Sequence, residues 1–475
     1  MTFSKEQAYA FEKFKQGENI FITGPGGTGK THLIHEMIKW LNEQGSSYQV
    51  CAMTGCAAVL IGKGTKTLHS WCGMGLASGP KDKIVQKICY NKRTGPILRR
   101  TKVLIIDEVS MLSKKIIEIL NMALKFIRRS QAPFGGMQVI MTGDFFQLPP
   151  VGNAYEEETC QFCFESPVWK ELFGLKNHIV LRHIFRQKEE IYKKILDQIR
   201  WGELDEESEM LLRGRLQVPV EGDVRPTKLF AVRAKADYIN SRMYEKLEGE
   251  ERIYPIQTKT NLRTYVESGK LIEMENIIKC DELSHKDKIA EDLMNNSNRV
   301  HQLALKCGAA VMCLHNICIE NGICNGSQGV IVGFAADTFP IVRFSNGHQM
   351  SIEPIWIQSE EFPCIGISQI PLCLAWALTI HKIQGATLAM GEMDLGHSVF
   401  EYGQTYVALS RIQSLDGLFL SAFHPKKIKA SPIVKEFYRA IPEHDYSHEE
   451  KNVFKSFELQ EEEEAAVSTV KIIRL

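Results

Sequence analysis

The sequence predicts an α/β protein built from two parallel-sheet units in tandem, with a small antiparallel β-barrel inserted in the second. Three observations support this fold class. Short apolar runs alternate with amphipathic helical patterns, the first run leads through a glycine-rich turn into a helix, and a second alternation of the same kind begins near residue 186. At 475 residues the chain is also too long for a single hydrophobic core.

The first unit is expected to span residues 1–185. A helix at 5–16, the apolar run "NIFITG" and an amphipathic helix at 30–44 open it, and the runs "YQVCAMT", "TKVLIID" and "MQVIMTGD" supply further strands. Apolar runs of this kind are typical of parallel strands that helices cover on both faces. The basic stretch at 72–100 interrupts the alternation, so we expect a small insertion at the edge of the sheet.

The rest of the chain is expected to contain three parts. Helix and strand patterns place the second α/β unit at residues 186–305 and 372–441. Between these ranges, short strands separated by Asn-Gly turns predict the β-barrel at 306–371. Residues 442–475 form an acidic tail, for which a solvated run of charges is the simplest interpretation.

The composition is that of an intracellular globular enzyme. The formal net charge is zero, so an attraction to nucleic acid would have to come from local grooves rather than from a global basic field. Thirteen scattered cysteines, and a start without a secretory or mitochondrial targeting pattern, predict free thiols in a reducing compartment, the cytoplasm or the nucleus. No run reaches the roughly eighteen apolar residues of a membrane span.

A phosphate-binding loop is the strongest chemical signal. The segment "GPGGTGKT" fits the pattern G-x-x-x-x-G-K-[ST] and lies between a predicted strand and a predicted helix, as the motif requires. Its backbone N–H groups would hold phosphate oxygens, Lys30 would reach the β and γ phosphates, and the Thr31 hydroxyl would bind magnesium. The expected nucleotide contacts are Gly24, Pro25, Gly26, Gly27, Thr28, Gly29, Lys30 and Thr31. The alternative, a glycine turn with a solvated lysine, does not explain the matching flanks.

Two adjacent acidic residues stand at the end of an apolar run: Asp107 is the last residue of "VLIID", and Glu108 follows it. Asp107 can share the magnesium ion with Thr31, and Glu108 can orient and deprotonate the attacking water. A metabolite kinase must exclude water from the γ-phosphate, so this adjacent pair favours hydrolysis over transfer. The expected cofactors are therefore ATP and magnesium, with Lys30, Asp107 and Glu108 as catalytic residues.

Three further residues are weaker candidates when taken alone. The Gln7 amide can read the adenine edge, although a solvated helix residue is the simpler interpretation. Arg186 in "IFRQ" and Arg411 in "VALSRIQS" are suited to neutralising transition-state charge from a second domain. Each arginine could equally form a surface ion pair.

Two loops carry groups that suit a polyanion. The first follows the second strand, where hydroxyls can grip phosphates and an indole can stack on a base. Its candidates are Thr54, His69, Ser70 and Trp71. The second loop, "TIHKIQG", offers His381, Lys382 and Gln384. Neither loop alone establishes DNA binding.

Taken together, these motifs resemble one family, the Pif-type (petite integration frequency) DNA helicases, which are related to RecD-like enzymes in group B of helicase superfamily one. The match runs in order through "FSKEQ", "GPGGTGKT", "TGCAAVLIGKGTKTLHSW", "IIDEVSML", "GDFFQLPPV", "FRQ", "LAWALTIHKIQGATL" and "YVALSRIQSLDGL", over roughly residues 3–440. The segment "KFIRRSQAPFGGMQ" is similar to the signature that separates this family from other helicases.

The resemblance implies two RecA-like P-loop NTPase domains with ATP between them. It implies Gln7 as the adenine reader, Gln147 as the γ-phosphate sensor, and Arg186 and Arg411 as arginine fingers. The insertion at 72–100 would be a wedge at the duplex fork, and the barrel a Src-homology-three-like module over the DNA.

The resemblance also implies the partner and the direction of movement. Single-stranded DNA would cross both domains, with movement 5′ to 3′ along the bound strand of a forked duplex. Gly385 joins the nucleotide-binding set, and the DNA-binding set gains Pro149, Val151 and Tyr406. We expect a monomeric ATP-dependent DNA helicase that works with proteins of DNA replication, repair or recombination. An ATP-gated clamp on single-stranded nucleic acid, without processive unwinding, stays open as the alternative.

Overall fold

The computed structural model describes residues 3–443 apart from short gaps. The gaps are residues 63, 76, 93, 154, 220–224, 231, 260–263, 268–269, 274–286, 288–289, 292, 295–301, 316, 336–338, 359–363, 381–382, 384–385, 397–398 and 400. The predicted acidic tail at 442–475 therefore lies outside the described residues beyond its first two positions. Among the described helices, none is both long enough and apolar enough to span a bilayer.

A six-stranded parallel sheet forms the centre of the first unit, with the order β3-β2-β4-β5-β1-β6. The strands are β1 (Ile20–Thr23), β2 (Tyr48–Ala52), β3 (Lys66–Thr67), β4 (Val103–Asp107), β5 (Gln138–Gly143) and β6 (His178–Val180). Because all strands run the same way, the loops that follow β1, β4 and β5 meet at one edge of the sheet. That edge carries the predicted nucleotide motifs.

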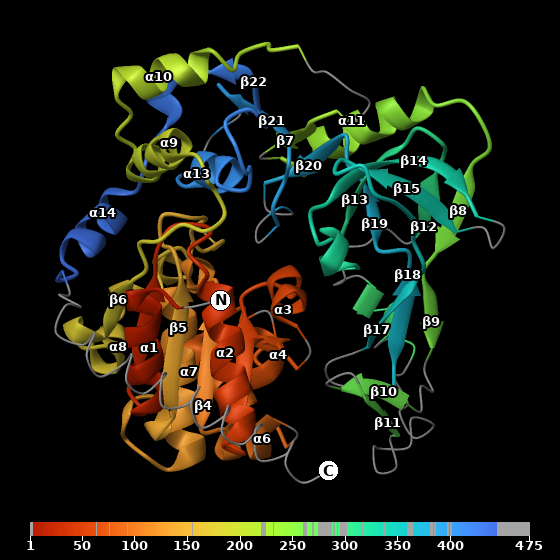
Figure 1. The fold of residues 1–475 in the computed structure, drawn as a ribbon. Helices are drawn as coiled ribbons and strands as arrows, with labels where there is room; N and C mark the ends of the chain where they lie inside the picture. Colours follow the sequence, from red (N-terminus) through yellow and green to blue (C-terminus); the bar gives the residue numbers. More distant parts are fainter. Residues whose placement is uncertain are drawn as a thin grey trace, which may run out of the picture.

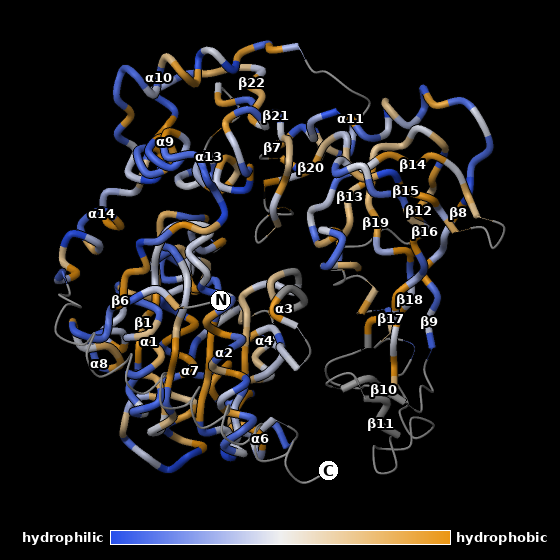
Figure 2. Tube along the Cα trace, in the orientation of Figure 1, coloured by the Kyte–Doolittle hydropathy of each residue, from blue (hydrophilic) through white to orange (hydrophobic). Residues whose placement is uncertain are grey.

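Helices cover both faces of this sheet (Figure 1). Along β1, Ile20 and Ile22 pack with α1 (Lys5–Lys15) and α2 (Lys30–Glu43), whereas Phe21 packs on the opposite side with α7 (Lys114–Arg128). The central strands β1, β4 and β5 are accordingly mostly hydrophobic and buried, as the orange colour in Figure 2 shows. The remaining helices are α3 (Gly55–Ile61), α4 (Leu68–Cys72), α5 (Lys81–Cys89), α6 (Thr94–Arg100) and α8 (Pro167–Leu172).

The stretch at 72–100 contains α5 and α6, which both contact α7. Ile84, Ile88 and Leu98 bury their side chains in the same core as α7. The stretch, expected as a small insertion at the edge of the sheet, therefore packs into the helical layer that contains α7.

A second parallel sheet, with four strands in the order β20-β7-β21-β22, forms the second unit. Its strands are β7 (Thr227–Phe230), β20 (Ala377–Thr379), β21 (Gly391–Leu395) and β22 (Leu418–Phe423). Its helices are α9 (Glu190–Trp201), α10 (Glu206–Arg213), α11 (Arg233–Glu245), α13 (Gln404–Leu409) and α14 (Pro432–Arg439). The prediction of an α/β protein with two parallel sheets is confirmed.

Antiparallel sheets form a third part of the molecule. One has five strands in the order β16-β15-β14-β13-β19, another has three in the order β17-β18-β9, and two further pairs are β12-β8 and β10-β11. The strands are β8 (Arg252–Pro255), β9 (Gln257–Lys259), β10 (Thr264–Glu267), β11 (Lys270–Glu273), β12 (Gln302–Leu305), β13 (Ala310–Cys313), β14 (Gln328–Phe334), β15 (Pro340–Phe344), β16 (Gln349–Ser351), β17 (Ile355–Gln358), β18 (Gly366–Gln369) and β19 (Leu372–Leu374). Antiparallel strands thus extend on both sides of the range 306–371, because β8 and β9 precede it and β19 follows it.

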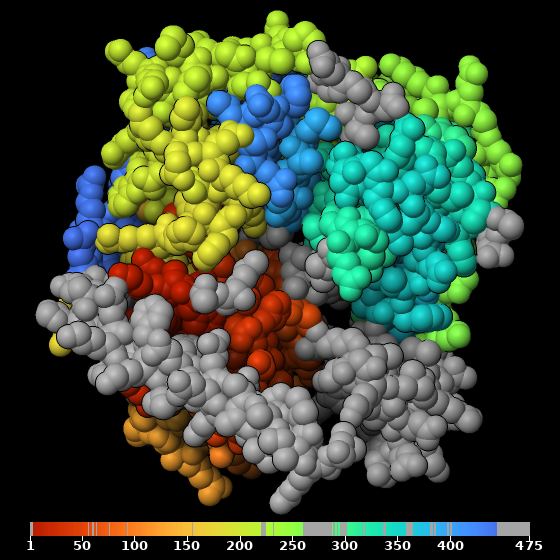
Figure 3. Space-filling model, in the orientation of Figure 1, coloured from red at the N-terminus to blue at the C-terminus, as the bar shows by residue number. Residues whose placement is uncertain are grey.

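The last described helix, α14, returns from the second unit to the first. Phe437 stacks on Phe164 with ring centroids 4.3 Å apart and lies 5.3 Å from Phe145. Figure 1 shows α14 at the side of the molecule between α9 and α8. In Figure 3 the yellow and blue surfaces of the second unit sit directly on the red first unit. Two segments of chain therefore connect the units, one before α9 and one before α14.

Candidate active site between the two units

The predicted phosphate loop, residues 24–31, joins β1 to α2 at the interface of the units. Gly24 has φ +146°, and a Cβ there would come within 2.3 Å of the Leu181 carbonyl oxygen. Gly29 has φ +79°, and a Cβ there would come within 2.6 Å of Gln7 Nε2. Both positions require glycine, because a side chain would strain the backbone and fill the loop. The loop N–H groups and the start of α2 provide a cradle suited to an anion.

Lys30 is folded back onto its own loop. Its ammonium donates to the carbonyl oxygens of Gly24 at 2.7 Å and Pro25 at 3.0 Å. Burial lowers the pKa of Lys30, while the carboxylates of Asp144, Glu108 and Asp107 oppose that shift. Phosphate oxygens can replace the two weak carbonyl acceptors, so the loop fits a nucleotide phosphate as predicted.

Asp107 and Glu108 follow β4 beside the phosphate loop. The Asp107 carboxylate accepts hydrogen bonds from the Thr142 hydroxyl and, at 2.9 Å, from the Glu108 backbone N–H. Burial raises the pKa of Asp107, and these two hydrogen bonds oppose the shift. Glu108 has φ +56°, a left-handed conformation that costs energy for this residue type. Thr31, in the first turn of α2, is exposed. Hydroxyl and carboxylate oxygens fit magnesium, which usually binds one or two carboxylates together with phosphate oxygens.

Gln7 is buried against the phosphate loop rather than solvated. Its Nε2 donates to the Thr28 carbonyl oxygen at 3.2 Å, and its Oε1 accepts the Ser4 backbone N–H at 2.9 Å, in a capping box that begins α1. One amide hydrogen and one lone pair remain for a base edge. The simpler interpretation, a solvated helix residue, is wrong.

Gln147, Arg186 and Arg411 meet in the cleft. Arg411 Nη2 donates to Gln147 Oε1 at 3.4 Å. A Cβ at Gly26 would lie 3.5 Å from Arg186 Nη1, which places that guanidinium on the phosphate loop. Burial lowers the pKa of Arg411, and burial together with Arg411 lowers the pKa of Arg186. Two arginines enclosed together without a bidentate carboxylate partner suit an anionic ligand. Neither is a surface ion pair.

Residues next to the two arginines fix their position. Gln187 Nε2 donates to the carbonyl oxygens of Ser410 at 3.1 Å and Ile412 at 2.9 Å. Arg186 Nη1 also donates to the Ser410 carbonyl oxygen, at 3.0 Å. The "FRQ" segment is therefore hydrogen-bonded to the turn that carries Arg411, so the guanidinium groups of Arg186 and Arg411 are held in a fixed relation to each other.

Tyr406 was expected at the DNA, and the structure corrects this. Its side chain is buried, and its hydroxyl accepts the Gly26 backbone N–H at 2.9 Å. Burial raises the pKa of Tyr406. Tyr406 lies in α13, and Arg411 follows two residues after the end of that helix. The same segment therefore places both the arginine and this hydroxyl at the phosphate loop. It belongs to the nucleotide side of the cleft.

The expected DNA-binding residues divide into three groups. Val151 is 78% exposed, Pro149 and Thr54 are half-buried, and Ser70 is exposed, so these four can meet a ligand. His69 belongs to the same group, because it is also half-buried, and burial lowers its pKa. Trp71 is 2% exposed inside the core, so the prediction that its indole stacks on a base is wrong. The third group, which comprises His381, Lys382 and Gln384 together with the nucleotide candidate Gly385, lies outside the described residues.

Sequence reasoning missed two residues of this interface. Arg200 and Tyr438 both contact Asp144, which lies three residues before Gln147. Their segments, "DQIRWG" and "EFYRA", read as ordinary amphipathic helices, so no local signal marks them. In the sequence, Asp144 stands out only as a charged residue at the end of the apolar run "MQVIMTGD".

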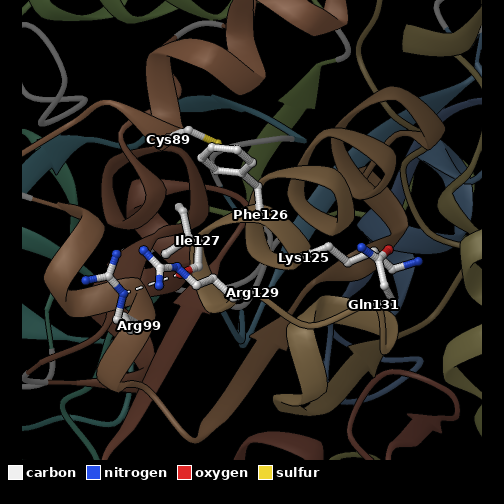
Figure 4. A pocket seen from close by; sticks show the side chains of 7 residues that line it. All are labelled: Cys89, Arg99, Lys125, Phe126, Ile127, Arg129 and Gln131. Carbon is white, nitrogen blue, oxygen red and sulfur yellow. Dashed lines mark hydrogen bonds between the residues drawn. The ribbon is translucent and has the colours of Figure 1, made fainter.

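A separate cavity of about 350 Å³ lies at the far end of α7 (Figure 4). Its lining residues are Cys89, Arg99, Lys125, Phe126, Ile127, Arg129 and Gln131. Arg99 Nε donates to the Ile127 carbonyl oxygen at 3.3 Å, which ties α6 to the end of α7. Three cationic side chains line this cavity, and none of the nucleotide-site candidates does.

Two family models match the chain. The PIF1-like helicase model covers residues 2–210, and the model of the 2B domain of DNA helicase Pif1 covers residues 289–334, which include β12 to β14. Among relatives, the ATP-dependent DNA helicase Pif1 of Bdellovibrio bacteriovorus is 34% identical over 92% of this chain and 91% of its own length. The ATP-dependent DNA helicase RRM3 of Saccharomyces cerevisiae is 32% identical over 90% of this chain, and the chain spans 66% of that protein's length.

Solved structures show the same likeness. The crystal structure of Pif1 helicase from Candida albicans matches with a TM-score of 0.71 and 32% identity, over 93% of this chain and 100% of that one. Bacteroides sp Pif1 in complex with ADP-AlF4 matches with a TM-score of 0.71 and 27% identity, over 93% and 97% of the two chains. Bacteroides Pif1 bound to ssDNA matches with a TM-score of 0.61 at the same identity and coverage.

Proposed function

The chain belongs to the family of PIF1-like helicases, and on that premise we propose that it is an ATP-dependent DNA helicase, which moves 5′ to 3′ along single-stranded DNA and separates the duplex ahead of it. The observation that carries the proposal is the placement of Arg186 and Arg411 against the phosphate loop and Gln147. A nucleotide in this loop touches groups from both units, so its hydrolysis can change how the units pack.

The nucleotide chemistry is assigned to residues at one edge of the first sheet. Thr31 and Asp107 would hold magnesium, and bound MgATP supplies a γ-phosphate that water can attack. Lys30 would leave its loop carbonyls to neutralise the phosphates, and Glu108 would accept the proton from the attacking water. The ADP-AlF4 complex of the Bacteroides relative supports a nucleotide in this cleft.

The DNA path is proposed to cross the first unit beside Thr54, His69, Ser70, Pro149 and Val151. Exposed Val151 and Ser70 support this path, as does the ssDNA complex of the Bacteroides relative. Loop 381–384 is proposed to supply the grip on the second unit. Contacts to the backbone of the strand would make binding independent of sequence and dependent on salt.

The finer domain assignments are proposals of the same kind. We assign the two parallel sheets to RecA-like domains, the first at 1–185 and the second within 186–305 and 372–441, and we assign the antiparallel strands, which include the segment 306–371 and its neighbours β8 to β12 and β19, to a Src-homology-three-like barrel. The stretch at 72–100 is assigned as the wedge at the fork. The cationic cavity between α6 and α7 supports a role near DNA for that layer.

A forked duplex tests the proposal directly. The chain should release the strand from a fork with a 5′ single-stranded tail during ATP turnover, and not from a fork with a 3′ tail. Lys30→Ala should abolish both hydrolysis and release, because Lys30 carries the positive charge that lies inside the phosphate loop itself. Lys39→Ala is the matched control, since Lys39 is exposed on the same helix α2 and should leave both activities unchanged.

Three outcomes contradict the proposal. Release by Lys30→Ala at the rate of the unaltered chain would exclude the assigned ATP site. Preference for the 3′ tail would exclude the assigned direction. Tight binding of the fork with ATP hydrolysis but without strand release would support the nucleic-acid clamp instead.

A further inference from the structure

A buried ion pair joins the two units three residues before Gln147. Asp144 follows β5 and has no exposed surface, and Arg200 of α9 is 5% exposed. Arg200 Nε donates to Asp144 Oδ2 at 2.9 Å, and Nη2 donates to Oδ1 at 3.0 Å. Although burial alone would lower the pKa of Arg200, the Asp144 carboxylate raises it above the usual value. A bidentate buried pair fixes both the distance and the orientation of its partners.

The hydroxyl of Tyr438 adds a third member from α14. It donates to Asp144 Oδ1 at 3.2 Å, accepts the Phe145 backbone N–H at 3.1 Å, and lies 2.6 Å from Thr23 Oγ1. Because a hydroxyl has one proton and two lone pairs, Thr23 must donate to it if Asp144 is to receive its proton. Thr23 is the last residue of β1 and directly precedes the phosphate loop. One oxygen atom thus links β1, β5 and α14.

Stacking holds the same group of side chains in one geometry. The Arg200 guanidinium lies 4.4 Å from the Phe146 ring centroid and 4.9 Å from that of Tyr438. The Phe146 and Tyr438 rings stack at 4.8 Å with an interplanar angle of 12°. A planar guanidinium satisfies both the carboxylate and the rings, whereas a lysine ammonium cannot make the bidentate contact.

Helix α9 connects this group to the arginine-bearing turn. Near its other end, the Tyr192 hydroxyl donates to the Leu409 carbonyl oxygen at 2.9 Å. Leu409 ends α13 and lies two residues before Arg411. Eight residues, or about 12 Å of helix, separate Tyr192 from Arg200. A displacement of Asp144 is therefore transmitted along a rigid helix to the side of the cleft that holds Arg411.

We propose that Asp144, Arg200 and Tyr438, here called the hinge cluster, are positioning residues about which the two units turn. Through this movement, the nucleotide state at Gln147 and the phosphate loop determines the affinity for single-stranded DNA. Arg200 and Tyr438 contact the first unit at Thr23, Asp144 and Phe145, which lie at the ends of β1 and β5, the strands that lead into the phosphate loop and the segment of Gln147. The inference rests on the proposed helicase function and names the residues that couple its two ligands.

Tyr438→Phe is the central test, because it keeps the stacked ring and removes only the shared hydroxyl. We measure the affinity for a single-stranded oligonucleotide in the absence of nucleotide and with ADP–aluminium fluoride. The unaltered chain should show a nucleotide-dependent change of at least about tenfold, within the range of typical coupling energies, and the variant should lose most of it. Its KM for ATP should stay close to that of the unaltered chain, whereas its melting temperature should fall modestly, because the buried Phe145 N–H loses its acceptor. Tyr90→Phe, at an exposed tyrosine of α5's end, is the control and should keep the full change.

Arg200→Lys provides a second variant with the charge retained. It should lose the coupling as Tyr438→Phe does, whereas Arg213→Lys, at an exposed arginine of α10, should not. The double variant Tyr438→Phe/Arg200→Lys should lose little more of the nucleotide-dependent change in DNA affinity than either single variant, since both substitutions disrupt the same cluster. Should Arg200→Lys fail to fold, the hydroxyl variant still decides the question.

The inference and the proposed function fail in different experiments. If Tyr438→Phe folds and keeps the nucleotide-dependent change in DNA affinity of the unaltered chain, the hinge cluster does not carry the coupling. If the unaltered chain shows this change but separates no forked duplex, the helicase activity fails and the hinge cluster stands as the coupling device of a clamp.

Discussion

Gly403 offers a sharp test of how closely the second unit must pack on the sensor segment. It lies at the N-cap of α13 with φ +75°, and a Cβ there would stand 2.4 Å from the Gln147 carbonyl oxygen and 2.6 Å from that of Phe146. Ordinary contact is about 3.5 Å, so Gly403→Ala must separate α13 from this backbone by roughly 1 Å. We expect kcat for DNA-stimulated ATP hydrolysis to fall about 10- to 100-fold, because a misplacement of that size moves Arg411 away from its partner.

The control separates this contact from backbone strain. Gly17 has φ +79°, and nothing lies within 4 Å of a Cβ built on it. Gly17→Ala and Gly403→Ala therefore share a conformational cost of about 1–2 kcal/mol, and overpacking adds about 1–3 kcal/mol at position 403 alone. Thermal unfolding measures these costs to stability, and steady-state ATP hydrolysis measures the loss of function. The reasoning is refuted if kcat of Gly403→Ala stays within about twofold of that of Gly17→Ala.

Three further predictions follow from contacts of single side chains. Phe437→Ala should lower the free energy of unfolding by about 2–3 kcal/mol, because its half-buried ring fills an aromatic cluster of the first unit, and a melting temperature equal to that of the unaltered chain would contradict this. Tyr406→Phe should tighten ADP binding up to about fivefold in an equilibrium titration, because the Gly26 N–H loses its internal acceptor and becomes available to phosphate, whereas weaker binding would mean that the hydroxyl contacts the nucleotide itself. Burial raises the pKa of Cys163 well above its usual value, so a maleimide should modify the exposed Cys160 and spare Cys163 in the folded chain, as peptide mass mapping can show.

The parts of the site that local chemistry encodes could be predicted from the sequence. Lys30 and Asp107 lie where their motifs place them, because a strand, a turn and a helix start are specified by neighbouring residues. Trp71 and Tyr406 were assigned to DNA because each adjoins a polar motif, yet their side chains point into the core and onto the phosphate loop. Which way a side chain faces depended on packing that the motif does not specify.

The hinge cluster shows a second limit. Arg200 lies 56 residues from Asp144, and Tyr438 lies 294 residues from it. No periodicity or spacing in one sequence relates positions so far apart, since the contact depends on how two sheets are docked. For the same reason the predicted start of the antiparallel part, residue 306, lies after β8, because β8 pairs with β12 across a long intervening segment.

The return of α14 to the first unit has a consequence for synthesis on the ribosome. The rings of Phe145 and Phe164 are synthesised more than 270 residues before the Phe437 ring that covers them. The first sheet can assemble early, but this aromatic surface stays open until residue 437 has emerged. The packing of the first unit therefore awaits α14, and a ribosome that stopped before residue 432 would leave a nascent chain with an exposed apolar surface that chaperones can bind.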